Sequence, residues 1–302
     1  QVTIIAGQNG TCKSTLLGML CQPFTFSEQK KKEDSSYTAN YDGLDLSQYR
    51  TLAGDRFKSE YSEVFRMSPA HDKSQDHRYT LFLSGECISD DYIKSNGLFV
   101  ISRWRETGKI RMVAGKGREH NSGSGNFPHP VIYLGLNRLC PLAKCIKMRI
   151  DSEKNLPEEE DKRWFVKTHN DILVLREPDN HAEFVQTNLS AKNDFFGPAG
   201  RDYSSECCSA GQDNLGQILT AVLSFKYLRA KLGEKYQGGL LLIDEFDNTF
   251  HPVAQLKLLK FLGEASRDYN LQVILTTHSL EILKNAYENP YRAFTKTIYL
   301  IR

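Results

Sequence analysis

Gly7, Lys13 and Ser14 have the spacing of a loop that binds phosphate groups. Residues 7–14 read Gly-Gln-Asn-Gly-Thr-Cys-Lys-Ser, which follows the phosphate-loop pattern GxxxxGKS except at Cys12. In such a loop, backbone N–H groups and the positive end of the following helix surround the phosphates. We expect Lys13 to reach the β- and γ-phosphates of a nucleotide and Ser14 to bind a magnesium ion. A chance Gly-Lys-Ser turn is the structural alternative.

Cys12 is the departure from this pattern. A side chain with a Cβ costs roughly 1–2 kcal/mol where the backbone needs a positive φ, whereas a small residue fits where only close backbone approach is needed. Two interpretations of the thiol are open, a small tolerated hydrophobic residue or a redox sensor. If alkylation of the thiol left nucleotide affinity unchanged, that result would count against sensing.

Two acidic residues follow an apolar segment late in the sequence. Residues 240–243 are Leu-Leu-Leu-Ile, which predicts a buried strand, and Asp244 and Glu245 come directly after it. Ligands of open α/β sheets bind at the carboxyl ends of strands. There Asp244 can hold magnesium through water, and Glu245 can orient or deprotonate an attacking water. Solvated acids at an ordinary strand end are the structural alternative.

Two histidines follow these acids. His278 ends another expected strand, within the Thr-Thr-His-Ser segment of residues 276–279, and can donate a hydrogen bond to a γ-phosphate. A purely structural histidine is the alternative. His251 precedes Pro252, so capping the helix that begins there explains it at least as well as catalysis does.

A third motif precedes a long amphipathic segment. Residues 209–213 are Ser-Ala-Gly-Gln-Asp, and residues 213–232 carry apolar side chains at helical spacing. Ser209 or Asp213 could simply cap this helix. Capping explains the serine but not the order of the motifs, which is phosphate loop, long insertion, Ser-x-Gly-Gln before a helix, Asp-Glu strand and His strand.

This order of motifs resembles that of the ABC-type ATPases. The segments IDEFDNTFHP and TTHS resemble those of the OLD-like branch of prokaryotic defence ATPases, which includes the Septu ATPases, and the likeness covers residues 1–22 and 204–302. The resemblance implies a homodimer or higher homo-oligomer whose ATPase heads enclose ATP and Mg²⁺. It also implies an antiviral role in which the ATP state controls a separate effector, such as an HNH nuclease.

The resemblance assigns roles to residues of both subunits. Ser209, Gly211 and Gln212 of one subunit would close the nucleotide site of the other, although Gly-Gln replaces the usual glycine-glutamate. The Q-loop glutamine of the family has no clear counterpart here. Glu245 and His278 are the expected catalytic residues, and Ser14 and Asp244 the expected metal ligands. The residues expected to contact the nucleotide are Gly7, Gln8, Asn9, Gly10, Thr11, Cys12, Lys13, Ser14, Thr15, Ser209, Gly211 and Gln212.

Other candidate groups lie in the middle of the chain. Six cations around Trp104 in one expected hairpin could bind a nucleic-acid backbone, with a solvated basic face as the alternative. They are Arg103, Arg105, Lys109, Arg111, Lys116 and Arg118. The pairs His71-Asp72 and Asp76-His77 contain metal-binding side chains, but their polar loop favours a surface role. Arg138 is interpreted as part of a structural ion pair rather than as an arginine at the phosphates.

Two functions of other classes are open. A chromosome-maintenance ATPase of the SMC type needs a long heptad coiled coil between the phosphate loop and residue 209, and residues 139–167 are too short and are broken by Pro157. A nucleotide sensor or scaffold that does not hydrolyse ATP is favoured by Cys12. Phosphate release at steady state distinguishes that sensor from an active ATPase.

The motifs require a sheet that brings the ends of distant strands together. Period-two patterning between residues 78 and 113 predicts antiparallel strands, and residues 139–167 suggest helical pieces. Residues 172–175 and 183–187 are shorter strand candidates. Apolar strands are expected at 2–6, 131–134, 240–243, 273–275 and 298–301, with helices over 13–20, 213–232, 253–265 and 280–286.

The expected fold class is α/β, a P-loop NTPase of the ABC-head type with a parallel core sheet, an antiparallel β subdomain and a helical insertion. Residues 1–24 and 204–302 are expected to form the ATPase core. Residues 25–138 would hold the antiparallel region and a polar insertion, with a surface or mobile loop from residue 25 to about residue 60. Residues 139–203 would form a helical protrusion with short strands.

Composition sets outer limits on these interpretations. The chain has 302 residues, 40% of them hydrophobic, and a net charge of +2, so it can bury a large core and has no global attraction to nucleic acid. No apolar run approaches the length of a membrane span. Cysteines without a CxxC pair are typical of reduced thiols in a cytosol, so we expect a cytoplasmic protein. The sequence begins at Gln1 without a methionine, and we expect further sequence upstream.

Overall fold

A computed structural model of the chain describes most of the residues on which these predictions depend. The described residues are 1–26, 41, 43–59, 64, 67–83, 91–106, 108, 110–115, 126–144, 148–151, 156, 158–176, 180–187 and 194–301. Lys109, Lys116 and Arg118 of the expected basic hairpin lie outside them. No helix within these ranges is both long and apolar enough to cross a membrane.

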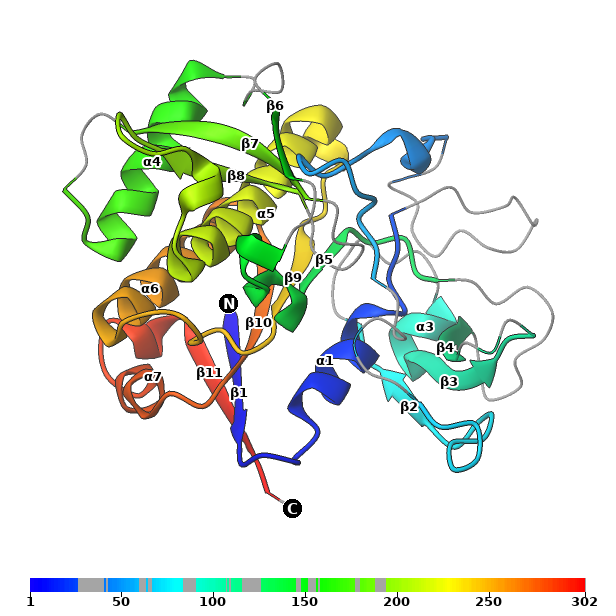
Figure 1. The fold of residues 1–302 in the computed structure, drawn as a ribbon. Coiled ribbons are helices and arrows are strands. Elements are labelled where there is room, and N and C mark those ends of the chain that lie inside the picture. The colour runs from blue at the N-terminus through cyan, green and yellow to red at the C-terminus, as the bar shows by residue number, and fades with distance from the viewer. Residues whose placement is uncertain are drawn as a thin grey trace.

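Five parallel strands form the core sheet, in the order β11-β1-β10-β9-β5 (Figure 1). The strands are β1 (Val2–Gly7), β5 (Val131–Leu134), β9 (Gly239–Ile243), β10 (Leu271–Thr277) and β11 (Thr295–Leu300). The inner strands are apolar along most of their length because both faces of the sheet are covered. The predicted parallel α/β core is confirmed, and its last strand begins three residues before the predicted start.

Helices cover the two faces of this sheet. The described helices are α1 (Lys13–Cys21), α3 (Asp91–Asn96), α4 (Glu159–Leu173), α5 (Ala210–Leu232), α6 (Pro252–Asp268) and α7 (Leu280–Ala286). Of these, α1 packs on one face of the sheet and α5, α6 and α7 pack on the other. Side chains alternate along each strand, so Ile4 and Leu241 share one core cluster with the helices α5, α6 and α7. Ile5 and Leu242 point the other way and pack with α1. The sheet is therefore the middle layer of the ATPase core.

Two separate antiparallel sheets flank the core, on different sides of the molecule (Figure 1). One contains β2 (Arg78–Leu81), β3 (Leu98–Trp104) and β4 (Ile110–Gly115), as the period-two patterning predicts. The other contains β6 (Met148–Asp151), β7 (His181–Thr187) and β8 (Phe195–Ala199). It is attached to α5, where the N–H of Phe196 donates to the hydroxyl of Thr220 at 2.9 Å.

Two expectations about the middle of the chain are wrong. The strand predicted at residues 172–175 is instead the end of α4, because Phe165, His169 and Ile172 recur at helical spacing and are all buried. The described part of residues 25–60 is more than a surface loop. Phe26 and Phe57 are fully buried there and join the main core cluster.

The edge strand β5 comes from the middle of the chain. Its residues lie within the segment 25–138, yet Val131–Leu134 pair in parallel register with β9, from Leu240 to Ile243. The N–H of Asp244 continues this pairing by donating to the carbonyl of Leu134 at 3.0 Å. The end of β5 therefore lies beside the first of the two candidate acids.

Candidate functional site

In the loop between β1 and α1, the two glycines have the positive φ angles that glycine permits. Gly7 has φ 155° and Gly10 has φ 80°. A Cβ on Gly7 would lie 2.7 Å from the carbonyl oxygen of Leu300 and 2.8 Å from the hydroxyl of Thr11, so only glycine fits. The Thr11 hydroxyl closes the turn by donating to the carbonyl of Gln8 at 2.8 Å. The loop leads directly into the N-terminus of α1, where a helix dipole favours anions.

Lys13 is folded back over this loop. Its Nζ donates to the carbonyls of Gly7 at 3.0 Å and Gln8 at 3.1 Å, and only 7% of the residue is exposed. The ammonium group therefore lies against the backbone that would wrap a phosphate. A phosphate oxygen is a stronger, charged acceptor than a carbonyl, so it can take over these hydrogen bonds.

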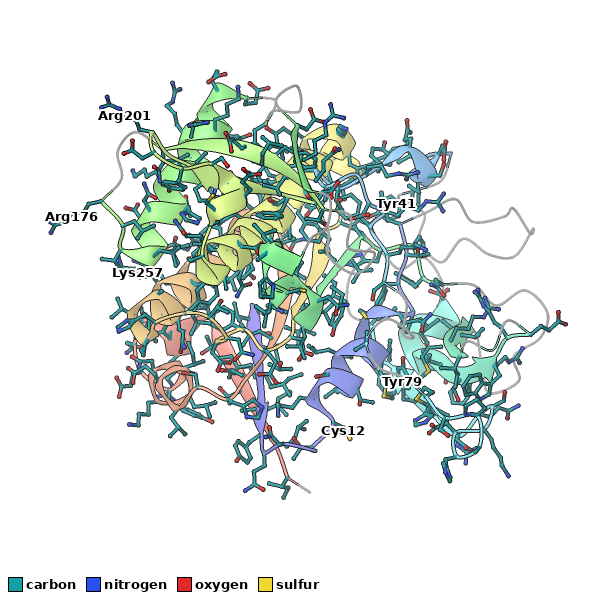
Figure 2. The ribbon with its side chains drawn as sticks, viewed as in Figure 1. Cys12, Tyr41, Tyr79, Arg176, Arg201 and Lys257 are labelled. Atoms are coloured by element: carbon teal, nitrogen blue, oxygen red, sulfur yellow. The ribbon has the colours of Figure 1, made fainter. Side chains whose placement is uncertain are left out.

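Cys12 occupies the left-handed region, with φ 62° and ψ 30°. It lies at the exposed surface between β1 and α1 (Figure 2). Because the backbone at residue 12 has a positive φ, a side chain with a Cβ is strained there and glycine is not. This strain explains why the pattern GxxxxGKS has glycine at this position.

We expect Cys12→Gly to be more stable than Cys12→Ala by about 1 kcal/mol, because alanine keeps the strained Cβ and glycine removes it. In an ordinary helical position alanine is the more stable residue of the two. Urea unfolding of both variants measures this order. Equal stability, or a more stable alanine variant, would show that the left-handed backbone at residue 12 carries no cost.

Asp244 is held firmly at the end of β9. The residue is 2% exposed, and one carboxylate oxygen accepts a hydrogen bond from the hydroxyl of Thr276, at the end of β10, at 2.6 Å. The same hydroxyl accepts the N–H of Glu245 at 2.8 Å. Burial, followed by the nearby Asp244 charge, raises the pKa of Tyr133 on β5 well above its usual value. A buried carboxylate in this position is available to a cation arriving from the strand ends.

Glu245 and His278 meet across the ends of β9 and β10. Their side chains are 3.5 Å apart, from Oε1 to Nε2, and are 22% and 33% exposed. The other carboxylate oxygen of Glu245 accepts from the amide of Asn248 at 3.2 Å. Glu245 has φ 49°, a left-handed backbone that is uncommon outside glycine and that concentrates at functional sites.

Asp247 fixes the backbone beside His278. One of its carboxylate oxygens accepts from the hydroxyl of Thr277 at 2.6 Å and from the N–H of His278 at 3.2 Å. The sequence reasoning did not single out this residue. Its position three residues after Asp244 was the available signal, but the pairing with β10 depends on the tertiary fold.

The order of the strands brings the motifs to one edge of the sheet. β10 lies between β1, which leads into the phosphate loop, and β9, which leads into the acids. Ala6 is the register partner of Thr277, and Leu275 is the partner of Ile243. Neighbouring strands are about 5 Å apart, so the ends of β1 and β9 are separated by about 10 Å. Lys13, Asp244, Glu245 and His278 therefore lie along one edge of the sheet, within the width of a single binding site.

The Ser-x-Gly-Gln segment caps α5. The hydroxyl of Ser209 accepts from the N–H of Gln212 at 3.3 Å, and the side-chain oxygen of Gln212 accepts from the N–H of Ser209 at 3.0 Å. This confirms the capping interpretation of Ser209. A Cβ on Gly211 would lie 3.0 Å from the carbonyl of Thr249. Within the described residues no hydrogen bond joins this segment to the loop at residues 7–15.

Arg138 has the structural role that the sequence interpretation favoured, but the sequence did not reveal its partners. It is 3% exposed, and its guanidinium donates to the carbonyls of Leu134, Gly135 and Glu245 at 2.9–3.1 Å. It also donates to the side-chain oxygen of Asn214 on α5 at 2.9 Å. Burial lowers the pKa of Arg138 to about 10. Arg138 therefore connects the end of β5 and the start of α5 to the backbone carbonyl of Glu245, the candidate general base.

We expect Arg138→Lys to destabilise the fold by roughly 2–3 kcal/mol, because an ammonium cannot satisfy four acceptors in a planar fork. Thermal unfolding measures this effect. Arg292→Lys, at an exposed arginine, is the matched control. An Arg138→Lys protein as stable as this control would contradict the bracing role of Arg138.

His251 and His77 make structural contacts in the fold. His251 is the N-cap of α6, where its side chain accepts from the N–H of Val253, which confirms the capping interpretation. In the polar loop, His77 lies 3.3 Å from Asp72. The described part of the chain contains no group of three or more metal-binding side chains.

Comparison with known proteins gives one family match. A family described as "AAA domain, putative AbiEii toxin, Type IV TA system" matches residues 211–284, about a quarter of the chain. The matched range includes Asp244, Glu245 and His278 and excludes the phosphate loop. No curated protein matches the sequence significantly.

Solved structures of SMC head domains also match, at low similarity. An SMC head bound to the C-winged helix domain of ScpA is 14% identical with a TM-score of 0.46, and the match covers 94% of this chain and 83% of that one. The SMC head from Thermotoga maritima is 13% identical with a TM-score of 0.38, covering 94% and 82%. An SMC head with an extended coiled coil, bound to the C-terminal domain of ScpA derived from Pyrococcus furiosus, is 12% identical with a TM-score of 0.39, covering 94% and 85%.

The loop geometry, the strand order and the family match point the same way. The glycine loop continues from β1 into α1, and the acid pair ends a strand that the family match includes. The core sheet is parallel and is separate from both antiparallel sheets. The chain therefore has the α/β fold of a P-loop ATPase.

Proposed function

We propose that the chain binds ATP with Mg²⁺ and hydrolyses it at the edge of the core sheet formed by the ends of β1, β10 and β9. The observation that carries this proposal is the Glu245–His278 pair at 3.5 Å, one strand away from the strand that leads into the phosphate loop. A base and a hydrogen-bond donor placed opposite a phosphate cradle are the parts that phosphoryl transfer to water requires.

The phosphate cradle is the segment from Gly7 to Thr15. Its backbone N–H groups would wrap the phosphates, and Lys13 would exchange the carbonyls of Gly7 and Gln8 for phosphate oxygens. Ser14 and Asp244 supply a hydroxyl and a carboxylate, which are the oxygen ligands that Mg²⁺ prefers together with phosphates and water. When bound, the ion would neutralise charge on the transferred phosphoryl group.

Glu245 is the proposed general base. Its carboxylate is oriented from two sides, by the amide of Asn248 and by the ring of His278. It can accept a proton from a water directed at the γ-phosphate, and His278 can donate a hydrogen bond to the phosphate oxygens. Arg138 holds the carbonyl of Glu245 and thereby fixes the direction of the side chain.

A second copy of the chain would complete the site. Ser209, Gly211 and Gln212 lie at the N-terminus of α5, whose exposed N–H groups and dipole favour an anion. In this subunit they contact one another and the turn at Thr249 rather than the phosphate loop. A homodimer or higher homo-oligomer would place them on the γ-phosphate held by the partner.

We propose further that ATP state in this assembly controls a separate effector nuclease in antiviral defence, as the resemblance to the OLD-like and Septu ATPases implies. The matched family carries the description of a putative AbiEii toxin of a Type IV TA system, which fits a role beside a second component. The described residues contain no metal-binding cluster that could serve as a nuclease centre, so an HNH-type effector would be another chain. Purification with the product of the neighbouring gene tests this partnership.

Two alternatives make different predictions. In an SMC-like ATPase a long coiled coil would separate the phosphate loop from α5, whereas the longest helix described between them is α4, with 15 residues. A sensor that binds but does not hydrolyse ATP is favoured by the left-handed Cys12. Phosphate release at steady state separates the proposals, since a sensor releases none above the level of a variant lacking Lys13.

A further inference from the structure

Asn214 is a fully buried polar residue in the first turns of α5. The amide group of its side chain donates to the carbonyl of Asn248 and to the hydroxyl of Thr249, both at 3.1 Å. Its side-chain oxygen accepts from the guanidinium of Arg138 at 2.9 Å. The amide has a single orientation, because a flipped amide would direct its N–H groups at the guanidinium and its oxygen at a carbonyl.

Both acceptors belong to the turn that carries the candidate base. This turn follows β9 and extends from Glu245 to Thr249. The side-chain amide of Asn248 donates to the carboxylate of Glu245 at 3.2 Å, and the backbone N–H of Asn248 donates to the carbonyl of Glu245 at 3.2 Å. Asn214 holds the carbonyl of the same residue. The direction of the Glu245 carboxylate therefore depends on Asn214 through one intervening residue.

A second route joins Asn214 to the candidate base through Arg138. The guanidinium that donates to Asn214 also donates to the carbonyl of Glu245, at 3.0 Å. Asn214 is thus the point where two hydrogen-bonded routes to Glu245 meet, one to its carboxylate and one to its backbone. A buried polar network whose members are satisfied is rigid, so this network fixes the position of the base.

The backbone of the turn needs support from outside. Glu245 has φ 49° and Thr249 has φ 71°, and a positive φ is an outlier for a β-branched residue such as threonine. Such conformations persist only where surrounding contacts hold them, and they concentrate at functional sites. Asn214 holds the hydroxyl of Thr249, and the carbonyl of Thr249 lies against Gly211, where a Cβ would be 3.0 Å away. The start of α5 therefore supports the turn.

We propose that Asn214 is a positioning residue for Glu245 of its own subunit, an inference that rests on the proposed hydrolysis of ATP. Displacement of a catalytic group by about 1 Å can cost roughly 100-fold in rate, so the contacts that fix the turn matter for turnover. The alternative is that Asn214 orders the segment from Ser209 to Gln212, which would act on the partner's nucleotide. Within the described residues, however, the Asn214 side chain makes no hydrogen bond to that segment.

The first test compares Asn214→Asp with the wild type. Aspartate keeps the size of the side chain and the acceptor for Arg138 but loses both amide hydrogens. We expect kcat for phosphate release to fall at least tenfold, while the affinity for a fluorescent ATP analogue stays within about threefold, since the loop at Lys13 is untouched. Asn289→Asp, at an exposed asparagine, controls for the added charge. An unchanged kcat, or a loss of affinity as large as the loss of rate, would overturn the proposal.

A matched pair of variants at the exposed Thr249 tests the same contact without changing a buried residue. Thr249→Val keeps the branched shape but removes the hydroxyl that accepts from Asn214, and Thr249→Ser keeps the hydroxyl. The loss of one hydrogen bond should lower kcat about fivefold in the valine variant, whereas the serine variant should stay within about twofold of the wild type. Equal kcat values for the two variants would show that this hydrogen bond does not position the base.

A mixed dimer shows on which subunit Asn214 acts. A dimer of one Lys13→Ala chain and one Ser209→Arg chain has one complete site, whose phosphate loop and Glu245 belong to the Ser209→Arg chain. Asn214→Asp in this chain should lower phosphate release at least tenfold, whereas in the Lys13→Ala chain it should change the rate by less than about twofold. The opposite pattern would assign Asn214 to the Ser209 segment and overturn the proposal. A wild-type protein that releases no phosphate would instead refute the proposed function itself.

Discussion

Replacing Glu245 with glutamine is expected to abolish ATP turnover and to leave ATP bound. Glutamine has almost the same shape and can still meet Asn248 and His278, which lie at 3.2 Å and 3.5 Å from the carboxylate. It cannot accept a proton from water at neutral pH. General-base catalysis contributes about 10²–10⁴-fold, so phosphate release should fall by at least two orders of magnitude.

Two measurements define this result. Phosphate release gives the rate, and equilibrium binding of a fluorescent ATP analogue gives the affinity, which should stay within about threefold of the wild type because the cradle is untouched. Glu288→Gln, at an exposed acid near the end of α7, is the control and should behave as wild type. Normal hydrolysis in Glu245→Gln would refute the assignment of the base.

Replacing Lys13 with alanine is expected to remove ATP binding itself. The ammonium group lies over the loop, held by the carbonyls of Gly7 and Gln8, and is the one side-chain cation of residues 7–15. Charge-assisted hydrogen bonds contribute about 1.5–3 kcal/mol each, so losing the contacts to two phosphates should weaken ATP binding roughly 100-fold or more.

The Lys13 and Glu245 variants should therefore fail in different ways. One loses affinity and the other loses only the chemical step, which a binding titration separates directly. Lys284→Ala, at an exposed lysine of α7, controls for the change in charge, and circular dichroism checks that the fold is intact. Unchanged ATP affinity in a folded Lys13→Ala protein would show that the nucleotide is held elsewhere.

The parts of the fold that the sequence predicted are those with strong local signals. The strands β1, β9 and β10 are short apolar runs ended by a glycine or by polar residues, because a parallel strand covered on both faces needs no alternation. The loop at Gly7 and Gly10 was predictable because the backbone there excludes most side chains. The candidate acids and His278 follow from where those strands end.

The parts that were missed depend on distant partners. β8 contains Gly197 and Pro198, residues that disfavour a strand, and it forms because it packs against α5. Residues 172–175 looked like a strand because they are all apolar and the β-branched Ile172 and Val174 favour β structure, but the buried stripe of α4 decided the outcome. Phe26 and Phe57 join the core from a polar stretch of sequence, and only the tertiary fold shows it.

Arg138 shows the same limit within the candidate site. Its four acceptors come from β5, from the turn after β9 and from α5, which are up to 107 residues apart in the sequence. A single arginine after a short strand gives no sign of such a network. The structural interpretation of the sequence is nevertheless close, since the residue braces the fold through carbonyls and an amide and lies near the charges of Asp244 and Glu245.

The central claim, that one triphosphate is shared by two chains, is tested most directly by complementation. Lys13→Ala and Ser209→Arg are co-expressed with different tags, and the mixed dimer is isolated through both tags. Each variant alone should release no phosphate, whereas the mixed dimer has one intact site and should regain about half of the wild-type rate. If the isolated mixed dimer forms and stays inactive, residue 209 does not act on the partner's nucleotide, and the composite site is wrong.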